Sequence, residues 1–578
     1  MEVSAPKARR PNVAGLRHVV AAGHYLAAHA GFTVLEAGGN AIDAGVAAGL
    51  ATNVVESHMT GIAGIAPVLI YLKETGEVVS IDGVGTAPKG ASCEYFQRHH
   101  GGVIEKGSMF EMVVPGTLDA WLTALERYGT LSFAEVAEAA IRLARDGFPM
   151  YPFLARLIAE RADITRLWPD SAAIYLPDDR PPVVGEVFVQ SDLARTLQFL
   201  ADEEAAGARR GRAEGIDAAR EAFYRGDIAA EIGRFFTANG GLLGAEDMAA
   251  FRVEVAPPAG VRFAETDVFT TGPWSTGPMM LQALNLLQGF DLAGMGHNTP
   301  DYIHTVIEAI KIAAADREAY YGDPRFVDVP IETLLSADHA DVRRALFQSD
   351  RALPAMPPPG EIDGYPRPTP PAATGSPVRD GRGGLGTSYV CAVDSQGNAF
   401  SATTTDGALG SPVVPGTGIS PTHSGRSFYT DPAHPACVAP GKRPRTACMP
   451  ALAIRKGRSV MPFGTPGSDV IPQAMLQVFL NVTVFGMLPQ DAIEAPRFAS
   501  YSFPESYFPH DNLPGVLRLE EPVGKAAGDA LAALGHTVEW WPDLMWRAGS
   551  VSAILMDEES GIRFGGADPR RTGYAVGW

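Results

Sequence analysis

The feature that most constrains the fold of this chain is an abrupt change of texture near residue 386. Residues 353–386 read LPAMPPPGEIDGYPRPTPPAATGSPVRDGRGGLG. This proline- and glycine-rich composition predicts a flexible, solvated linker, longer than the structureless loops of most compact domains. The next segment, TSYVCAVDSQGNAFSATTT, has the pattern of a β-hairpin around residues 394–398. The linker is therefore expected to lead directly into Thr387, the first residue of a buried strand.

The junction has two interpretations. A precursor that cuts itself between Gly386 and Thr387 would expose a new N-terminal threonine. Such a residue carries nucleophile and base together, because its own amine can take the hydroxyl proton. The alternative is a hinge between two domains that is followed by an ordinary edge strand. The residues at the junction leave both interpretations open.

Composition excludes several classes of function. The chain has 578 residues and a net charge of −19. This acidity argues against nucleic-acid or anionic-membrane binding, since both require a basic surface. The sequence shows neither an evident signal peptide nor an apolar run long enough to cross a bilayer. We therefore expect a cytoplasmic protein, or a periplasmic or secreted one if a leader was removed before numbering began.

The cysteines and histidines give no metal pattern. The four cysteines are far apart in sequence and none belongs to a CxxC pair, so neither zinc nor a disulfide framework is expected. Most of them are interpreted as small buried apolar side chains. No HxH or HExxH spacing occurs among the thirteen histidines. The four cysteines are Cys93, Cys391, Cys437 and Cys448.

Hydrophobic periodicity predicts long helices and antiparallel hairpins. Helices are expected over 41–56, from 117, and over 133–148, 191–207, about 218–236, 299–324 and 470–486. Hairpins are expected over 67–82, 389–403 and 450–463. Hairpins that pack with long helices indicate a layered α+β fold rather than a parallel sheet.

Two further segments could carry acyl-transfer chemistry. Gly467-Ser468 follows a predicted strand and precedes a predicted helix, where unpaired N–H groups can stabilise an oxyanion. A plain turn and helix cap is the alternative there. One of Thr403, Thr404 and Thr405 should return beside Thr387, although threonine is also simply common in strands. No P-loop or GxSxG motif occurs.

At this point the sequence resembles the γ-glutamyltranspeptidase family of N-terminal-nucleophile (Ntn) hydrolases over nearly its whole length. The resembling segments occur in family order with similar spacing. They include EAGGNAIDAGVAAGLA, VPGTLDAWLTALERYG, DREAYYGDPRFV, TSYVCAVDSQGNAFSATTT, GKRPRTACMPALAI, FGTPGSDVIPQAMLQVFLN and ADPRRTGYAVGW. The resemblance implies a four-layer αββα sandwich with two central antiparallel sheets and helical outer layers.

The resemblance also implies how the chain is processed and how it reacts. Residues 1–386 would become a large subunit and 387–578 a small one, interlocked as one folding unit. Thr387 would be the nucleophile that first attacks the Gly386 carbonyl, and Thr405 would hydrogen-bond to it. Gly467 and Ser468 would form the oxyanion hole for a small-molecule amide substrate. Neither cofactor nor metal is implied, and a higher oligomer is compatible with this scheme.

The positions that bind the γ-glutamyl group in the family are substituted here. They fall on Cys93, Gly407, Ser427, Thr446 and Ala447. Losing both partners of a charged clamp should cost several kcal/mol of selective binding. We therefore expect an amidohydrolase or acyltransferase of shifted specificity.

Two arginines flank the substituted positions. Arg426 or Arg445 could recognise a different carboxylate or polar acyl group, and a structural arginine is the alternative. Two other functions are also retained as alternatives. They are a genuine γ-glutamyltranspeptidase or glutathione hydrolase, and an unprocessed binding protein without activity.

Overall fold

Two seven-stranded sheets form the centre of the protein, and the strand pairs within them are antiparallel. The computed structural model describes residues 8–365 and 386–578. In spatial order, the first sheet contains β19 (Tyr574–Gly577), β2 (Val19–Ala22), β10 (Thr387–Val393), β11 (Ala399–Thr405), β3 (Val68–Leu72), β4 (Glu77–Ile81) and β7 (Val255–Ala256). The second contains β1 (Val13–Gly15), β18 (Arg563–Ala567), β17 (Ser552–Asp557), β13 (Ser459–Gly464), β12 (Ala451–Arg455), β9 (Thr266–Thr270) and β8 (Ala259–Phe263).

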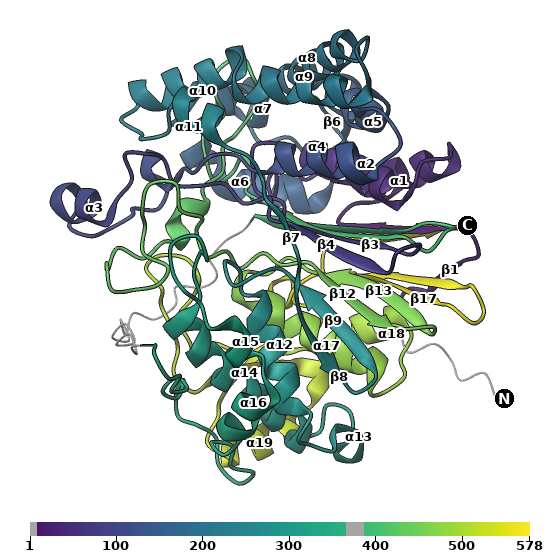
Figure 1. Ribbon diagram of the computed structural model, residues 1–578, viewed down its shortest axis with the longest axis vertical. Helices are drawn as coiled ribbons and strands as arrows, with labels where there is room; N and C mark the ends of the chain where they lie inside the picture. Colours follow the sequence, from purple (N-terminus) through teal and green to yellow (C-terminus); the bar gives the residue numbers. More distant parts are fainter. Residues whose placement is uncertain (1–7, 366–385) are drawn as a thin grey trace.

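The two sheets pack face to face through alternate side chains of their strands. Tyr389 and Val393 of β10 share one buried apolar cluster with Leu452 of β12 and Ile554 of β17. Figure 1 shows the sheets stacked in the middle of the molecule, with a group of helices on each outer side. One large apolar core therefore lies between each sheet and its helices, and a third, smaller core lies between the two sheets.

The helices over the first sheet come from the N-terminal part of the chain. They are α1 (Tyr25–Glu36), α2 (Ala41–Val55), α4 (Thr117–Tyr128), α5 (Phe133–Asp146), α6 (Pro152–Thr165), α7 (Pro169–Tyr175), α8 (Ser191–Gly207), α9 (Arg212–Tyr224), α10 (Asp227–Ala238) and α11 (Ala245–Ala250). Helix α2 is buried on all sides. A Cβ at Gly45 would lie 2.1 Å from the Phe400 ring of β11, so this glycine allows the close helix–sheet approach.

The helices beyond the second sheet come from both halves of the sequence. They are α12 (Gly277–Leu287), α13 (Leu292–Met295), α14 (Pro300–Tyr320), α15 (Ile331–Leu334), α16 (Ala337–Arg344), α17 (Ile471–Thr483), α18 (Pro489–Glu494) and α19 (Lys525–Ala533). Smaller sheets join β14 (Phe498–Ser500), β15 (Val516–Glu520) and β16 (Thr537–Trp541), and β5 (Phe148–Pro149) with β6 (Val187–Phe188). Helix α3 (Cys93–His100) lies at the side of the molecule (Figure 1).

The expected combination of antiparallel sheets and helices is confirmed, with two local corrections. The single helical segment expected around 218–236 is two helices, α9 and α10, because the chain turns at Gly226, which caps α10. The start of the predicted linker is not free in solvent. Leu353 donates its N–H to Glu308, and Gly360 donates its N–H to Asp316. Residues 366–385 of the linker lie outside the described residues.

Both sheets contain strands from before and from after residue 386. Strand β10 pairs with β2 on one edge and β11 on the other, and β11 in turn pairs with β3. In the second sheet, β12 pairs with β9. None of the helices in residues 8–365 and 386–578 combines the length and the apolar character needed to cross a bilayer.

Candidate active site

Thr387 lies at the start of β10 with its hydroxyl group between two oxygen atoms. Its Oγ1 donates to the Gly386 carbonyl oxygen at 2.5 Å and lies 2.9 Å from Thr405 Oγ1. The Cys448 sulfur is 3.8 Å from the same hydroxyl. Thr387 is only 4% exposed and Thr405 is fully buried. The arrangement places a shielded hydroxyl against the peptide bond that precedes it.

The register of the hairpin selects which threonine faces Thr387. Thr405 pairs directly with Thr387, whereas Thr404 pairs with Ser388 and Thr403 with Tyr389. Because alternate residues point to opposite faces of a sheet, Thr404 points away from Thr387. Its hydroxyl instead bonds to Thr60 Oγ1 and accepts from Asn53. Geometry thus separates three threonines that the sequence alone left equivalent.

Two charged side chains near Thr387 were not singled out by the sequence analysis. Arg571 donates from Nη1 to the Thr387 carbonyl oxygen at 3.4 Å. Glu56, at the end of α2, accepts at 2.5 Å from the hydroxyl of Ser388. Burial raises the pKa of Glu56, against the hydrogen bond from Ser388 and the charge of Arg571. The available sequence signal for Glu56 was its position, since it is a charged residue at the C-terminal end of a helix that is apolar on nearly all sides.

Gly467 and Ser468 form a tight turn between β13 and α17. Both residues adopt positive φ angles, +143° at Gly467 and +54° at Ser468. Asp469 fixes the turn, since it accepts from Arg317 and from the Ser506 hydroxyl, each at 2.6 Å. Within the described residues, neither the Gly467 nor the Ser468 N–H has a backbone acceptor outside the helix. The contacts of Asp469 thus hold the backbone of this turn in a fixed geometry.

These two residues line a small cavity of about 70 Å³ beside a larger one of about 590 Å³. Arg571 lines the small cavity, and Gly386 lines the large one. Trp546 and Arg547 border both. Gly386 and the Gly467–Ser468 turn thus line neighbouring cavities that share Trp546 and Arg547.

The larger cavity has a mixed charged lining in which Arg426 stands out. Its guanidinium lies 4.2 Å from the centre of the Tyr507 ring, and among residues 8–365 and 386–578 its buried Nε has no hydrogen-bond partner. Burial raises the pKa of Glu111 to about 7, against the nearby charge of Arg426. The remaining polar lining residues include Lys106, Arg161, Glu160, His58 and His423. Such a surface suits an anionic or strongly polar group.

Of the predicted substrate-binding positions, Gly407 and Arg426 line the larger cavity and the others line neither cavity. Arg445 is fully buried and donates to Glu318 at 2.7 Å, so it is a structural arginine. Ser427 is 1% exposed, and Ala447 packs in the core beneath the second sheet. Thr446 accepts from the Cys448 N–H. Cys93, the first residue of α3, has its Sγ 3.3 Å from the carbonyl oxygen of Val438.

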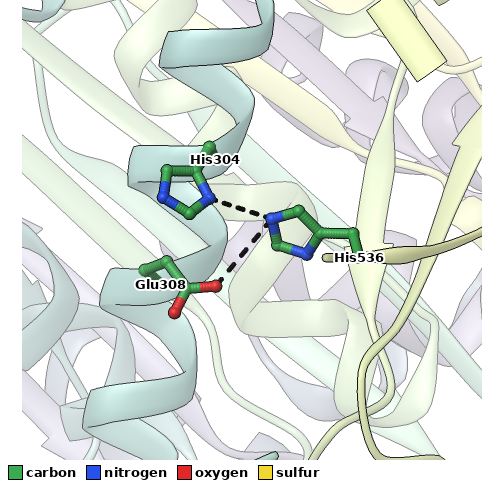
Figure 2. Close-up of side chains that lie close together, drawn as sticks. All are labelled: His304, Glu308 and His536. Atoms are coloured by element: carbon green, nitrogen blue, oxygen red, sulfur yellow. Dashed lines mark hydrogen bonds and ion pairs between the residues drawn. The ribbon is translucent and has the colours of Figure 1, made fainter. Parts of the chain in front are cut away.

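One group of possible metal ligands occurs among the described residues, and it lies away from both cavities. Figure 2 shows His304 and Glu308 of α14 pointing toward His536. His304 Nδ1 lies 2.9 Å from His536 Nε2, and His304 Nε2 lies 2.8 Å from the Gln348 carbonyl oxygen. Lys311 Nζ already contacts Glu308 at 2.7 Å. This lysine neutralises the carboxylate, so the network is balanced by the protein's own charges.

Comparison with known proteins gives a consistent set of relatives. The sequence profile of the gamma-glutamyltranspeptidase family matches residues 27–578. An acylase ACY 1 proenzyme from Pseudomonas sp. (strain SE83) is 34% identical over 97% of this chain and 94% of its own length. A glutathione hydrolase-like YwrD proenzyme from Bacillus subtilis (strain 168) is 32% identical over 98% of this chain and 99% of its own. The crystal structure of a cephalosporin acylase from Bacillus halodurans has a TM-score of 0.85 at 29% identity, covering 100% of this chain and 99% of that one.

Proposed function

The chain belongs to the gamma-glutamyltranspeptidase family, and we propose that it is a self-processing amidohydrolase or acyltransferase with Thr387 as nucleophile. The observation that carries the proposal is the hydroxyl of Thr387, held 2.5 Å from the Gly386 carbonyl oxygen and 2.9 Å from Thr405. A side-chain oxygen in this position is suited first to internal attack and then to acyl transfer. Relatives named as proenzymes support the same conclusion.

We further propose that the fold is the four-layer αββα sandwich of Ntn hydrolases. The three apolar cores, two under helices and one between the sheets, support this layering. In this scheme residues 1–386 and 387–578 become two subunits. Because β10 is inserted between β2 and β11, cleavage would leave the subunits interlocked.

Maturation would begin with attack of Thr387 Oγ on the carbonyl carbon of Gly386. The C–N bond breaks, the amide nitrogen takes the hydroxyl proton, and an ester links Gly386 to the threonine oxygen. This step already frees the Thr387 amine, and water then hydrolyses the ester, which releases the Gly386 carboxylate and restores the Thr387 hydroxyl. Thr405 orients the hydroxyl during the attack, and Arg571 holds the Thr387 carbonyl.

Turnover would use the same groups in the mature enzyme. The new amine accepts the Thr387 hydroxyl proton while the oxygen attacks a substrate amide. Amides of Gly467 and Ser468 would stabilise the tetrahedral oxyanion, where one such donor contributes roughly 10²–10³ in kcat. Collapse expels an amine, and water or a second amine removes the acyl group from the threonine.

The acyl group is proposed to be anionic and different from γ-glutamyl. The unpartnered Nε of Arg426 in the larger cavity supports this choice. The substitution of the family's clamp positions supports it too. Arg445 has no part in it, because its charge is already matched by Glu318.

The test combines mass analysis with a substrate panel. Denaturing mass analysis of the purified protein should show two polypeptides that meet between Gly386 and Thr387, and the Thr387→Ala variant should remain uncut. Amides of dicarboxylic and of neutral acids should then be compared with a γ-glutamyl anilide. Preference for dicarboxylic monoamides that falls at least tenfold in Arg426→Gln is expected. Activity that persists in Thr387→Ala would refute the proposal.

A further inference from the structure

Two partly exposed thiols, one from each side of the cleavage junction, lie next to each other. Cys93 is the first residue of α3, and Cys437 lies in the loop that follows residues 424–427. The Cys93 thiol is within hydrogen-bond reach of the Cys437 sulfur. Its Sγ also lies 3.3 Å from the carbonyl oxygen of Val438, the residue after Cys437. The two sulfur atoms therefore share one small site.

Backbone hydrogen bonds hold the two segments that carry the thiols beside each other. Ala87 donates to the Lys442 carbonyl at 2.8 Å, and Gly441 donates back to the Ala87 carbonyl at 2.9 Å. Phe96 of α3 and Val438 belong to one apolar cluster that also contacts Cys93. Packing and hydrogen bonds therefore hold the two segments that carry the thiols against each other.

A buried cation points at one of the sulfur atoms. Lys442 is 2% exposed, and its Nζ lies 3.8 Å from Cys437 Sγ and 2.7 Å from the Pro435 carbonyl oxygen. The hydrogen bond from Cys93, followed by the charge of Lys442, lowers the pKa of Cys437 to about 6, against burial and the charge of Asp431. A thiolate is the reactive form of cysteine in disulfide exchange. Cys437 is thus the attacking sulfur of the pair.

The other two cysteines provide an internal contrast. Cys391 and Cys448 are completely buried, and burial raises the pKa of each to about 12. In the described part of the chain, no lysine contributes to the pKa shift of either thiol. Their thiols are therefore protonated and shielded at neutral pH, so they serve as controls on the same molecule.

We propose that Cys93 and Cys437 are a redox-active pair that closes into a disulfide by exchange with a low-molecular-weight disulfide. The Cys437 thiolate attacks one sulfur of the small disulfide and expels a first small thiolate. Cys93 loses its proton to solvent and attacks Cys437 Sγ of the mixed disulfide, which expels a second small thiolate. The protein gives up two electrons, and the small disulfide is reduced to two thiols.

The bridge has a particular consequence in the mature enzyme. Cys93 belongs to residues 1–386 and Cys437 to 387–578, so the bond would link the two subunits covalently. This consequence, unlike the bridge itself, rests on the proposed cleavage before Thr387. The oxidation state would then decide whether the denatured enzyme runs as one chain or as two.

The experiment uses the full-length protein with 2-hydroxyethyl disulfide as the oxidant. Free thiols are blocked with N-ethylmaleimide, and the proteolytic peptides are identified by mass. The expected product is one cross-linked peptide pair that contains Cys93 and Cys437, lighter by two hydrogen atoms than the separate reduced peptides. Cys391 and Cys448 should stay reduced. After reduction with dithiothreitol, both cysteines should again react with N-ethylmaleimide, and the two peptides should be recovered separately in blocked form.

Variants separate the proposal from simple accessibility and from processing. Cys93→Ser should stop at the mixed disulfide on Cys437, and Lys442→Met should slow closure at pH 7 about tenfold. Thr387→Ala should still form the bridge, so failure of processing leaves the cross-linked peptides in place. Absence of the cross-linked pair in the wild-type protein, or equal rates in Lys442→Met and the wild type, would overturn the proposal.

Discussion

Replacing Thr405 by valine tests whether its hydroxyl orients the nucleophile. Valine keeps the β-branched shape in β11 and removes only the oxygen that lies 2.9 Å from Thr387 Oγ1. Both side chains are buried, so no bulk water replaces the lost partner. Leaving a buried hydroxyl without one of its partners costs about 1–3 kcal/mol. Since about 1.36 kcal/mol corresponds to tenfold in rate, cleavage should slow roughly 5- to 150-fold.

The assay follows the fraction of intact chain with time by denaturing mass analysis. Thr405→Ser, which restores a hydroxyl group, should recover most of the rate, while Thr387→Ala should give no cleavage. Thermal unfolding of the uncut Thr387→Ala chain, with and without the valine, measures any structural cost of the change. A valine variant that cleaves within twofold of wild type would refute the role given to Thr405.

Three further predictions concern a buried ion pair, a buried carboxyl group and the Gly467–Ser468 turn. Arg445→Met leaves the buried Glu318 carboxylate with fewer cationic partners and should lower the free energy of unfolding by about 3–5 kcal/mol. The control Arg455→Met, at an exposed ion pair, should lower it by only about 0–1 kcal/mol. Equal thermal midpoints of the two variants would contradict this difference. Burial raises the pKa of Glu111 to about 7, so its carboxyl group contributes stability that is present below about pH 4.5 and is lost as the pH rises through about 7. Glu111→Gln, which cannot ionise, should therefore gain stability relative to wild type across that interval, and a constant difference in melting temperature would exclude the effect. Ser468→Gly should preserve turnover, because the proposed donor is the backbone N–H and glycine accepts a φ of +54° without strain. Ser468→Pro should abolish turnover, because proline lacks the N–H and cannot adopt this positive φ.

The hairpin that carries Thr387 could be predicted because its information is local. Strand alternation, the turn residues and a return strand ending in three threonines lie within one short segment. The turn at Gly467 was equally visible, since it separates a strand pattern from a helix pattern. Segments of this kind specify their own conformation, and tertiary packing only completes them.

The rest of the site depends on contacts between distant parts of the chain. Arg571 follows Thr387 by 184 residues, and no periodic pattern predicts that the two would meet. Local sequence also could not show which of the two arginines beside the substituted positions faces a cavity. Arg426 and Arg445 are each followed by a small hydroxyl residue, yet one lines a cavity and the other is neutralised by Glu318. Pairing of buried charges is decided by tertiary structure, so only the structure could separate these two residues.

The proposed chemistry and the strand order place the same requirement on the fold. A threonine that becomes an N-terminal base must not move when its chain is cut, or the new amine would leave the catalytic position. Strand β10 is held by β2 on one side and β11 on the other, and its first residue pairs with Thr405. The pairs that β10 makes with β2, at Val390–Val393, lie well beyond the peptide bond before Thr387. Cleavage would therefore create the amine at the end of a strand that both neighbours still hold.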